Sequence, residues 1–440
     1  MLIYSTHITP RLQYIIDFIA GEISAGPWEL TGDPVLFISS YKNKINYSYQ
    51  HFEGNILEIR PHNLLFEENI KPQQINCTQP NQTVVFFQNE SETGFDIFAA
   101  IFYLITRYEE YLPHQKDLHG RYSHLNSLAY KENFLHTPLI NIWLKNFSAL
   151  LISHFPSFRL KENHFLLLPT YDIDMAWSYK HKGWLRTAGG IGKELARFRV
   201  RNIAQRIRVL TGKEEDPFYN FKWLDTLHQK YELRPEYFFL AAEKTSDKDK
   251  NIAPRQPAMQ QLIKQVSLRY ATGLHPSWQS GDNYSILKNE KALLENITGQ
   301  PVTTSRQHYL RVTFPTTYQQ LIATGIKEDY SMGYAAENGF RASVASVFYW
   351  FDLSKNQATP LKIVPFCFMD ATSIYYKNHT PSQALEALYP LWQEVKKING
   401  CFCMIWHNDT FKSEDWRKMY ETFIRSATAK KNYGPENAYP

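Results

Sequence analysis

An apolar run in this sequence ends in two aspartates, whose carboxylates could bind a metal or transfer a proton. In LLLPTYDID, Asp172 and Asp174 follow three leucines and stand two positions apart. Residues two apart on a β-strand begin on the same face, so both carboxylates should point the same way. A buried carboxylate is costly without a counter-charge. The pair therefore indicates a metal ion, or a division of labour between a base and a metal ligand; capping of the next loop is the alternative.

Three histidines end other apolar runs. His275 ends ATGLH and is followed by Pro276, which stops a strand; Arg306 and His308 stand two apart in VTTSRQHYLR; His407 ends FCMIWH. One histidine on an apolar face is usually a core residue. Three at equivalent ends of three β-runs, beside a pair of aspartates, favour a shared site instead.

The residue types match metal chemistry. Two histidines and an aspartate can hold Zn²⁺ or another divalent metal and leave positions open for water and substrate. The remaining carboxylate and histidine would then be free for proton transfer.

After residue 162, strand-like and helix-like segments alternate, and these elements must position the residues named above. The strand-like runs are HFLLLPT, EYFFLAA, ATGLH, VTTSRQHYL, EDYSMGY, LKIVPFCFMD and CFCMIWHND, and helical patterns lie between most of them. This alternation predicts an α/β fold whose parallel strands form a closed or nearly closed barrel. In such barrels the chemistry lies at the carboxyl ends of the strands, where the polar residues of this half gather.

Residues 1–162 do not show a regular alternation of strands and helices. LIYS, PVLFISS and ILEIR read as strands, and PRLQYIIDFIAGEI, FDIFAAIFYLITRYEEYL and PLINIWLKNFSALLISHF read as helices. We therefore expect a smaller α+β domain of unknown role over residues 1–162, the barrel over 163–428 and a polar tail over 429–440.

Residues 178–213 form a basic insertion after the first barrel strand. They carry ten Lys and Arg against one Glu. Ile191, Leu195, Phe198, Ile203 and Ile207 recur at near-helical spacing, which predicts a basic amphipathic helix. Either it docks on the barrel with a solvated face, or it contacts anionic lipid or a phosphate-bearing substrate.

Composition narrows the class of protein. The chain has 440 residues, a net charge of +5 and 43% hydrophobic residues, which is typical of a globular protein and does not predict nucleic-acid binding. Four cysteines are too few for a disulfide scaffold. The first residues lack the basic stretch of a signal peptide, and FDIFAAIFYLI is too short to span a membrane, so we expect a cytoplasmic protein.

The order of the motifs resembles the polysaccharide deacetylase family, the NodB-homology domain of carbohydrate esterase family 4, over about residues 163–425. TYDID, GLHPS, TGQPVTTSRQH and IWHND resemble its successive motifs. The whole chain looks like a two-domain subset from Bacteroidetes-type bacteria, of which SRQHYLR and GFRAS are characteristic. The resemblance implies an irregular (β/α)7 barrel and a divalent metal, Zn or else Co, Ni or Mn, that serves to hydrolyse N- or O-acetyl groups on a sugar or glycan.

The resemblance also implies roles for individual residues. Asp172 matches the catalytic base and Asp174 a metal ligand. Arg306 matches the motif arginine, which would fix Asp172 as a carboxylate. His407 matches the general acid, and Asp370, at the end of FCFMD, matches the carboxylate that orients it.

The second motif departs from the family pattern. The family has two metal histidines four residues apart, but Gln279 stands four residues after His275. His308 would supply the missing ligand from the neighbouring strand. Arg341, Trp278 and Trp406 are candidate substrate contacts, with core packing the alternative for both tryptophans.

Two other functions compete with the deacetylase. A carbohydrate-binding protein could keep the barrel without the activity, and Gln279 favours that interpretation. A glycoside hydrolase would need two separated carboxylates and no metal, which the aspartate pair and the histidines oppose.

Overall fold

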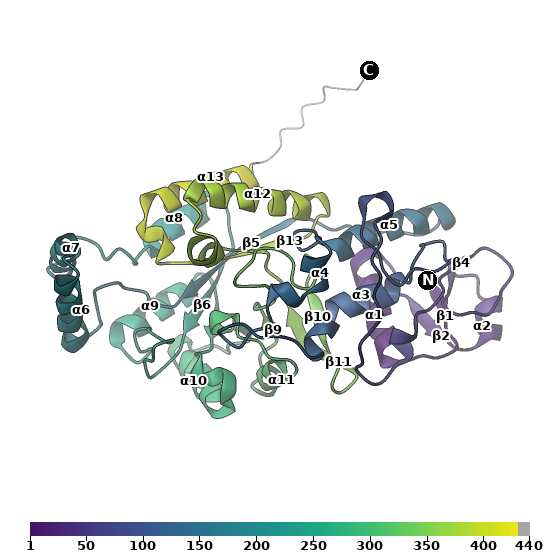
Figure 1. The fold of residues 1–440 in the computed structure, drawn as a ribbon, viewed down its shortest axis with the longest axis horizontal. Coiled ribbons are helices and arrows are strands. Elements are labelled where there is room, and N and C mark those ends of the chain that lie inside the picture. The colour runs from purple at the N-terminus through teal and green to yellow at the C-terminus, as the bar shows by residue number, and fades with distance from the viewer. Residues whose placement is uncertain (430–440) are drawn as a thin grey trace, which may run out of the picture.

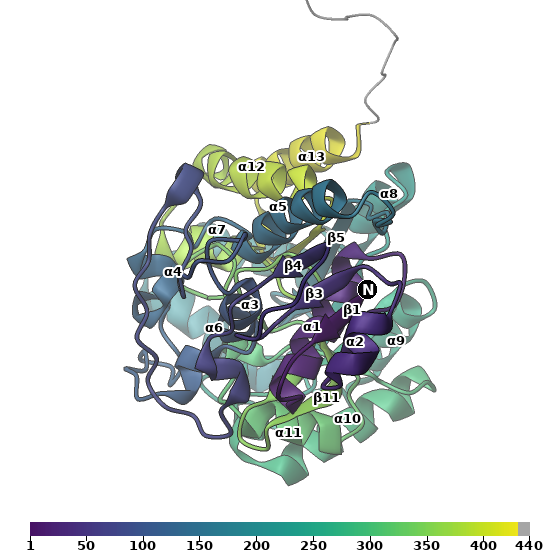
Figure 2. The ribbon, with the colours of Figure 1, turned by 90° about the vertical axis from the view of Figure 1, so that its right-hand side faces the viewer.

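The computed structural model describes residues 1–429; the polar tail predicted over 429–440 lies outside them, apart from its first residue. The molecule is elongated. In Figure 1 the N-terminal part lies at the right, the large sheet in the middle and the helices of the basic insertion at the left end. Figure 2 shows α12 and α13 on one side of the molecule and α10 and α11 on the opposite side.

A small parallel sheet organises the N-terminal part, with strand order β2-β1-β3-β4. Its strands are β1 Leu2–Tyr4, β2 Glu29–Thr31, β3 Lys44–Asn46 and β4 Ile56–Glu58. The helices of this part are α1 Pro10–Ile23, α2 Pro34–Ser39, α3 Ile97–Ile105, α4 Leu128–Lys131 and α5 Leu139–His154. The strands are all parallel, as in alternating α/β folds, although we predicted a mixed α+β arrangement.

The run PVLFISS is a helix, α2, so the strand that we predicted there is wrong. Asp33 precedes it and accepts hydrogen bonds from the backbone N–H groups of Val35 and Leu36, while Pro34 occupies the first turn. An Asp cap followed by proline is a helix start signal, and here it outweighs the β-preference of the apolar residues.

A nine-stranded sheet forms the rest of the molecule, in the order β10-β11-β9-β8-β7-β6-β5-β13-β12. Its strands are β5 Leu166–Ile173, β6 Glu236–Leu240, β7 Ala271–His275, β8 Thr304–Ser305, β9 Glu328–Asp329, β10 Phe348–Asp352, β11 Gln357–Ile363, β12 Phe368–Met369 and β13 Cys401–His407. All neighbours are parallel except β10 and β11. The helices around it are α8 Phe221–Lys230, α9 Pro257–Ser267, α10 Tyr284–Thr298, α11 Thr316–Ala323, α12 Pro381–Lys397 and α13 Glu414–Thr428.

Within residues 1–429 this sheet does not close into a barrel, because β10 and β12 are its two free ends. The predicted strand LKIVPFCFMD is two strands, β11 and β12, separated by residues 364–367. Pro365 lies in this gap, but β5 and β11 each continue through a proline, Pro169 and Pro360, so the break does not follow from the missing N–H alone. A hairpin partner for β11, the strand β10, was not predicted.

The basic insertion is two helices, α6 Trp184–Ala196 and α7 Val200–Leu210, rather than the single helix that we predicted. The chain turns at Phe198, whose backbone φ is +54°. The two helices contact each other. The apolar stripe therefore lies on a helical hairpin.

Side chains of both parts form one continuous core. Tyr14 on α1 packs its ring 5.0 Å from that of Phe351 on β10 and donates a hydrogen bond to the Tyr349 carbonyl. Within residues 1–429, no helix is both long and apolar enough to cross a membrane.

A buried charge network joins the two parts. Glu110 accepts hydrogen bonds from Arg107, whose Nε lies 2.7 Å from Oε1, and from Arg341, whose Nε lies 2.9 Å from the same oxygen. Burial alone would raise the pKa of Glu110, but the two guanidinium groups outweigh it and lower the pKa. Removing one member of such a network leaves the others buried without full compensation.

We predict that Glu110→Ala lowers the free energy of unfolding by about 3–5 kcal/mol, because both arginines lose a buried counter-charge. Denaturant unfolding followed by circular dichroism measures the loss. The control is Glu394→Ala, which removes the partner of the exposed Lys397 and should cost less than about 1 kcal/mol. Equal losses in the two variants would contradict a stabilising role for the network.

Candidate metal centre and active site

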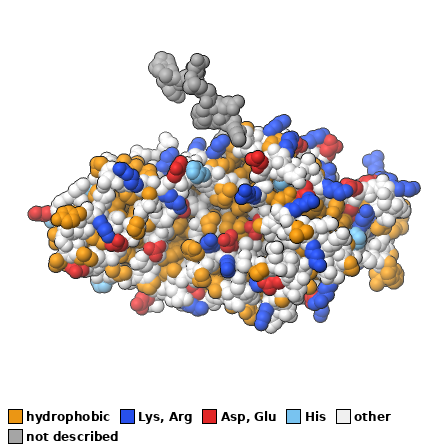
Figure 3. Space-filling view, turned by 180° about the vertical axis from the view of Figure 1, so that it is seen from behind, with side chains coloured by type: hydrophobic (Ala, Val, Ile, Leu, Met, Phe, Trp, Pro, Cys, Tyr) orange, Lys and Arg blue, Asp and Glu red, His pale blue; other side chains and the backbone are white. Residues whose placement is uncertain are grey.

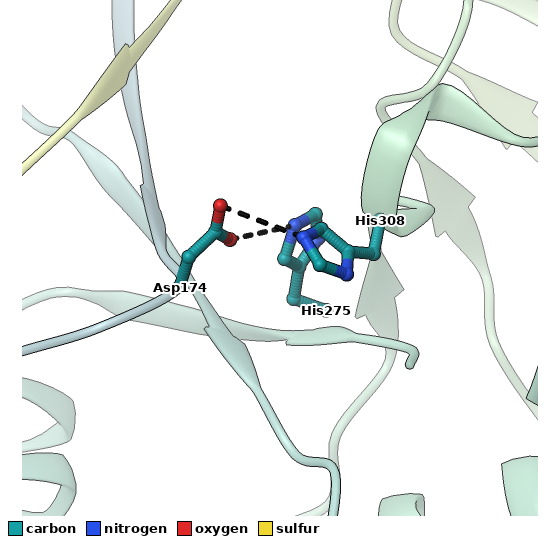
Figure 4. Close-up of side chains that lie close together, drawn as sticks. All are labelled: Asp174, His275 and His308. Atoms are coloured by element: carbon teal, nitrogen blue, oxygen red, sulfur yellow. Dashed lines mark ion pairs between the residues drawn. The ribbon is translucent and has the colours of Figure 1, made fainter. Parts of the chain in front are cut away.

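Asp174, His275 and His308 come together at the carboxyl ends of neighbouring strands. Each offers a ligand atom, and these atoms lie within 4.8 Å of one another. Figure 4 shows the Asp174 carboxylate facing both imidazoles. Its Oδ1 lies 3.2 Å from His275 Nε2, and its Oδ2 lies 3.5 Å from His308 Nε2. Asp174 directly follows β5 and His275 ends β7, whereas β8 stops at Ser305 and His308 begins a short 3-10 helix.

Both histidines are held by their other nitrogen. His275 Nδ1 lies 2.5 Å from the Arg306 carbonyl oxygen, and His308 Nδ1 lies 3.0 Å from Asp249 Oδ1. An imidazole that donates through Nδ1 presents Nε2 as a lone pair, which is how histidines are commonly fixed as metal ligands. Burial lowers the pKa of His308, but the Asp174 and Asp249 carboxylates outweigh it and raise that pKa to about 9.

The residues fit a divalent metal. Asp174 Oδ1 is buried and, among the described residues, accepts no hydrogen bond. Two imidazole nitrogens and a carboxylate oxygen are a donor set that suits Zn²⁺ and other first-row divalent ions. The three donors around this buried oxygen therefore form a possible site for a cation.

Asp172 lies beside this trio and is held by an arginine. Its Oδ1 accepts a hydrogen bond from Arg306 Nη1 at 2.8 Å, and its Oδ2 lies 3.9 Å from His275 Nε2. The Arg306 guanidinium is buried over the Phe238 ring, 4.5 Å from its centroid. A Cβ at Gly273 would lie 2.5 Å from that ring, so glycine on β7 leaves room for it.

His407 faces the trio from the end of β13. Its Nδ1 lies 2.7 Å from Asp370 Oδ1, and Asp370 Oδ2 accepts hydrogen bonds from the His407 N–H and from Thr410 Oγ1. Its Nε2 lies 4.0 Å from Asp174 Oδ2. Burial opposes the charged imidazole, but the Asp370 carboxylate outweighs it, so the pKa of His407 stands well above its ordinary value.

A cavity of about 510 Å³ is lined by Asp172, Asp174, His275, His308 and His407. Its wall also contains side chains that the sequence analysis missed, among them Arg121, Lys248 and Tyr309. Arg121 belongs to the N-terminal part and donates to the Tyr309 carbonyl at 2.9 Å and to the Tyr376 hydroxyl at 3.0 Å. Arg121, Lys248 and Asp249 lie in loops without a periodic pattern, so no sequence signal pointed to them.

The three residues predicted to contact substrate lie in different surroundings. The prediction for Arg341 is wrong, because its guanidinium is buried against Glu110. The prediction for Trp406 is also wrong, since its side chain is fully buried and packs against Phe411 and Tyr420. Trp278 is half-buried outside the cavity wall, with its ring edge-on to that of Tyr309, which does line the cavity.

Gln279, at the position where the resembling family has its second metal histidine, is exposed in a short 3-10 helix and is not part of the cavity wall. His308 instead stands against His275, with the ring centroids 4.9 Å apart. The structure thus brings His308, and not Gln279, beside His275 and Asp174.

Comparisons with known proteins give a family match for the N-terminal part only. Residues 1–156 match a family of unknown function, DUF7033. No curated protein matches the chain.

Several solved structures are similar to about three fifths of the chain. One, assigned as a polysaccharide deacetylase from Mycobacterium smegmatis, is 13% identical with a TM-score of 0.41, covering 62% of this chain and 87% of that one. The polysaccharide deacetylase Bc1974 from Bacillus cereus is 10% identical with a TM-score of 0.31, covering 63% and 96%. A third is a mutant of a CE4-family pseudoenzyme with restored activity, 12% identical with a TM-score of 0.27, covering 61% and 64%. At such values any argument about activity has to come from the site itself.

We predict that His308→Ala and His275→Ala each weaken Zn²⁺ binding by more than roughly tenfold, because each removes one of three ligands. Metal content after dialysis against buffered zinc, determined by elemental analysis, measures this. His136→Ala, at an exposed histidine, is the control and should keep the metal. Unchanged metal content in His308→Ala would rule out the rearranged ligand set.

Proposed function

We propose that this protein is a metal-dependent hydrolase that removes acetyl groups from an N-acetylated or O-acetylated sugar or polysaccharide precursor. The observation that carries the proposal is the arrangement of three candidate metal ligands between an arginine-held aspartate and an aspartate-held histidine. A base on one side and an acid on the other is what amide or ester hydrolysis requires.

Asp174, His275 and His308 would hold the metal. A divalent ion bound there lowers the pKa of a coordinated water and polarises an acetyl carbonyl. Zinc suits the donor set best, and Co, Ni and Mn are alternatives.

Asp172 would accept the proton of the attacking water. Arg306 keeps this carboxylate in place through Oδ1, and Oδ2 remains directed toward the metal ligands. With Oδ1 engaged by Arg306, Oδ2 is the oxygen that would take the proton.

His407 would deliver a proton to the leaving group. Asp370 fixes Nδ1 and leaves Nε2 toward the cavity. The elevated pKa of His407 keeps the imidazole protonated until the leaving amine or alkoxide takes the proton.

The N-terminal part of the chain would complete the site. Arg121 supports this role, because it lines the cavity and fixes the backbone at Tyr309.

We predict that the two aspartates differ in function. Asp172→Asn should keep the metal and lose activity by roughly 10²-fold or more, because an amide cannot accept the proton. Asp174→Asn should lose the metal itself. Elemental analysis and acetate release from an N-acetylated chito-oligosaccharide and an O-acetylated oligosaccharide measure the two effects.

Two results would contradict the proposal. Equal metal loss in both variants would make both carboxylates ligands and leave the base unassigned. Wild-type protein that binds metal but releases no acetate would favour the competing interpretation, a carbohydrate-binding protein with the fold but without the activity.

We predict that Asp370→Asn lowers kcat by roughly 10²-fold or more while the metal content stays unchanged, since Asp370 holds His407 and contacts none of the three candidate metal ligands. Because Asp370 raises the pKa of His407, its loss should move the alkaline limb of the kcat–pH profile to lower pH. A uniform loss of activity without this shift would indicate a structural defect instead.

A further inference from the structure

The interface between α6 and α7, which we call the seam of the hairpin, contains a buried ion pair. Arg206 on α7 is buried between the helices, with its Nη2 3.0 Å from Glu194 Oε1 on α6. A Cβ added at Gly190 would lie 2.7 Å from that guanidinium, so the arginine is packed directly against the α6 backbone. The Arg206 guanidinium also lies over the Tyr179 ring, 4.7 Å from its centroid. A charged pair therefore holds the two helices together.

The large apolar side chains of the hairpin face outward. Phe198 at the turn is 91% exposed, Trp184 78% and Val200 69%. Leu185, Leu195, Ile207 and Leu210 are also exposed. Val209 is buried and Ile191 and Ile203 are half-buried, but the larger part of the apolar surface is outside while the ion pair is inside. A hairpin that only had to be soluble would bury more of these residues and leave the ion pair outside. The exposed apolar surface is therefore available to a partner.

Positive charge surrounds the apolar residues. The turn reads Arg197-Phe198-Arg199-Val200-Arg201, and all five residues are exposed. The segment 178–213 contains ten Lys and Arg against one Glu, more positive charge than the +5 of the whole chain. Figure 3, seen from behind, shows blue basic and orange apolar side chains together at the right-hand end, where the hairpin lies.

The hairpin is fixed to the body on the side of the cavity. Arg186 donates to the backbone carbonyls of Lys250 at 3.0 Å and Asn251 at 3.2 Å. Lys248 and Lys250 of that segment line the cavity, and Asp249 between them holds His308. The exposed surface is therefore part of a built element and not a loose loop.

We propose that the α6–α7 hairpin docks this protein onto an anionic lipid bilayer. Phe198, Val200 and Trp184 enter the boundary between headgroups and acyl chains, and the basic side chains of the turn bind lipid phosphates. Aromatic and aliphatic residues flanked by Arg are typical of interfacial membrane binding. A second copy of the chain fits less well, because pairing two such hairpins would bring their like charges together.

Co-sedimentation of the full chain with vesicles tests the proposal. We expect binding to vesicles of phosphatidylglycerol and phosphatidylcholine in equal parts, weak binding to phosphatidylcholine alone, and steep loss of binding as salt rises. Reversing Arg197→Glu, Arg199→Glu and Arg201→Glu together should weaken binding by at least about tenfold. Phe198→Ser with Val200→Ser should also weaken it, because the apolar contribution is removed.

A matched control makes the same charge change elsewhere. Lys145→Glu, Lys288→Glu and Lys355→Glu alter three exposed lysines on other elements and should leave binding within about twofold of the wild type. Unfolding midpoints should be the same in all variants, since the changed side chains are exposed.

Three results would overturn the proposal. The first is wild-type protein that does not sediment with anionic vesicles at low salt. The second is a control triple variant that loses as much binding as the hairpin variant. The third is a dimer, measured by light scattering, that the hairpin substitutions convert to monomer, since the surface would then be an interface between copies. None of these results bears on the deacetylase activity, which is measured with soluble oligosaccharides.

Discussion

The orientation of three imidazoles around one carboxylate is the constraint on which the site depends. Each imidazole is anchored on its outer side through Nδ1 and turns Nε2 inward, at 3.2, 3.5 and 4.0 Å from the oxygens of Asp174. The anchored rings and their acceptors are His275 with the Arg306 carbonyl, His308 with Asp249, and His407 with Asp370. Because each anchor comes from a different segment, the site forms only when the sheet is assembled in its observed order. The formation of the site therefore depends on the order of the strands in the sheet as well as on the types of its residues.

The sequence predicted the residues at strand ends and missed those that lie between elements. Asp174, His275 and His407 follow apolar runs, and parallel strands bring their carboxyl ends to one edge, so their meeting could be inferred from pattern alone. Asp249 and Arg121 lie in loops, where the path of the chain depends on tertiary contacts that no periodicity reports. For the same reason Arg341 was assigned to the substrate, although its partner is a glutamate more than two hundred residues away in sequence.

The errors in the fold have a common physical origin. Apolar content did not fix the local conformation, which a few capping and turn residues decided. Asp33 and Pro34 started a helix within a run that is β-like in composition. At Phe198 a left-handed residue turned one predicted helix into a hairpin. Side-chain capping and backbone restrictions act over three or four residues and outweigh the weaker average propensity of a longer window.

The hairpin shows what an amphipathic pattern can and cannot establish. Its periodicity was visible in the sequence, but periodicity alone does not distinguish a helix that buries its stripe on its own protein from one that presents it to a partner. The structure separates these cases by where the ion pair lies. The pair formed by Arg206 and Glu194 lies between the helices, whereas Leu195, Phe198 and Ile207 of the stripe are exposed and Ile191 and Ile203 are half-buried. Burying charge while exposing aromatic rings is unfavourable for a hairpin surrounded only by water, since apolar surface is left hydrated. The arrangement becomes favourable when the outer face meets a surface that is apolar beneath and anionic above.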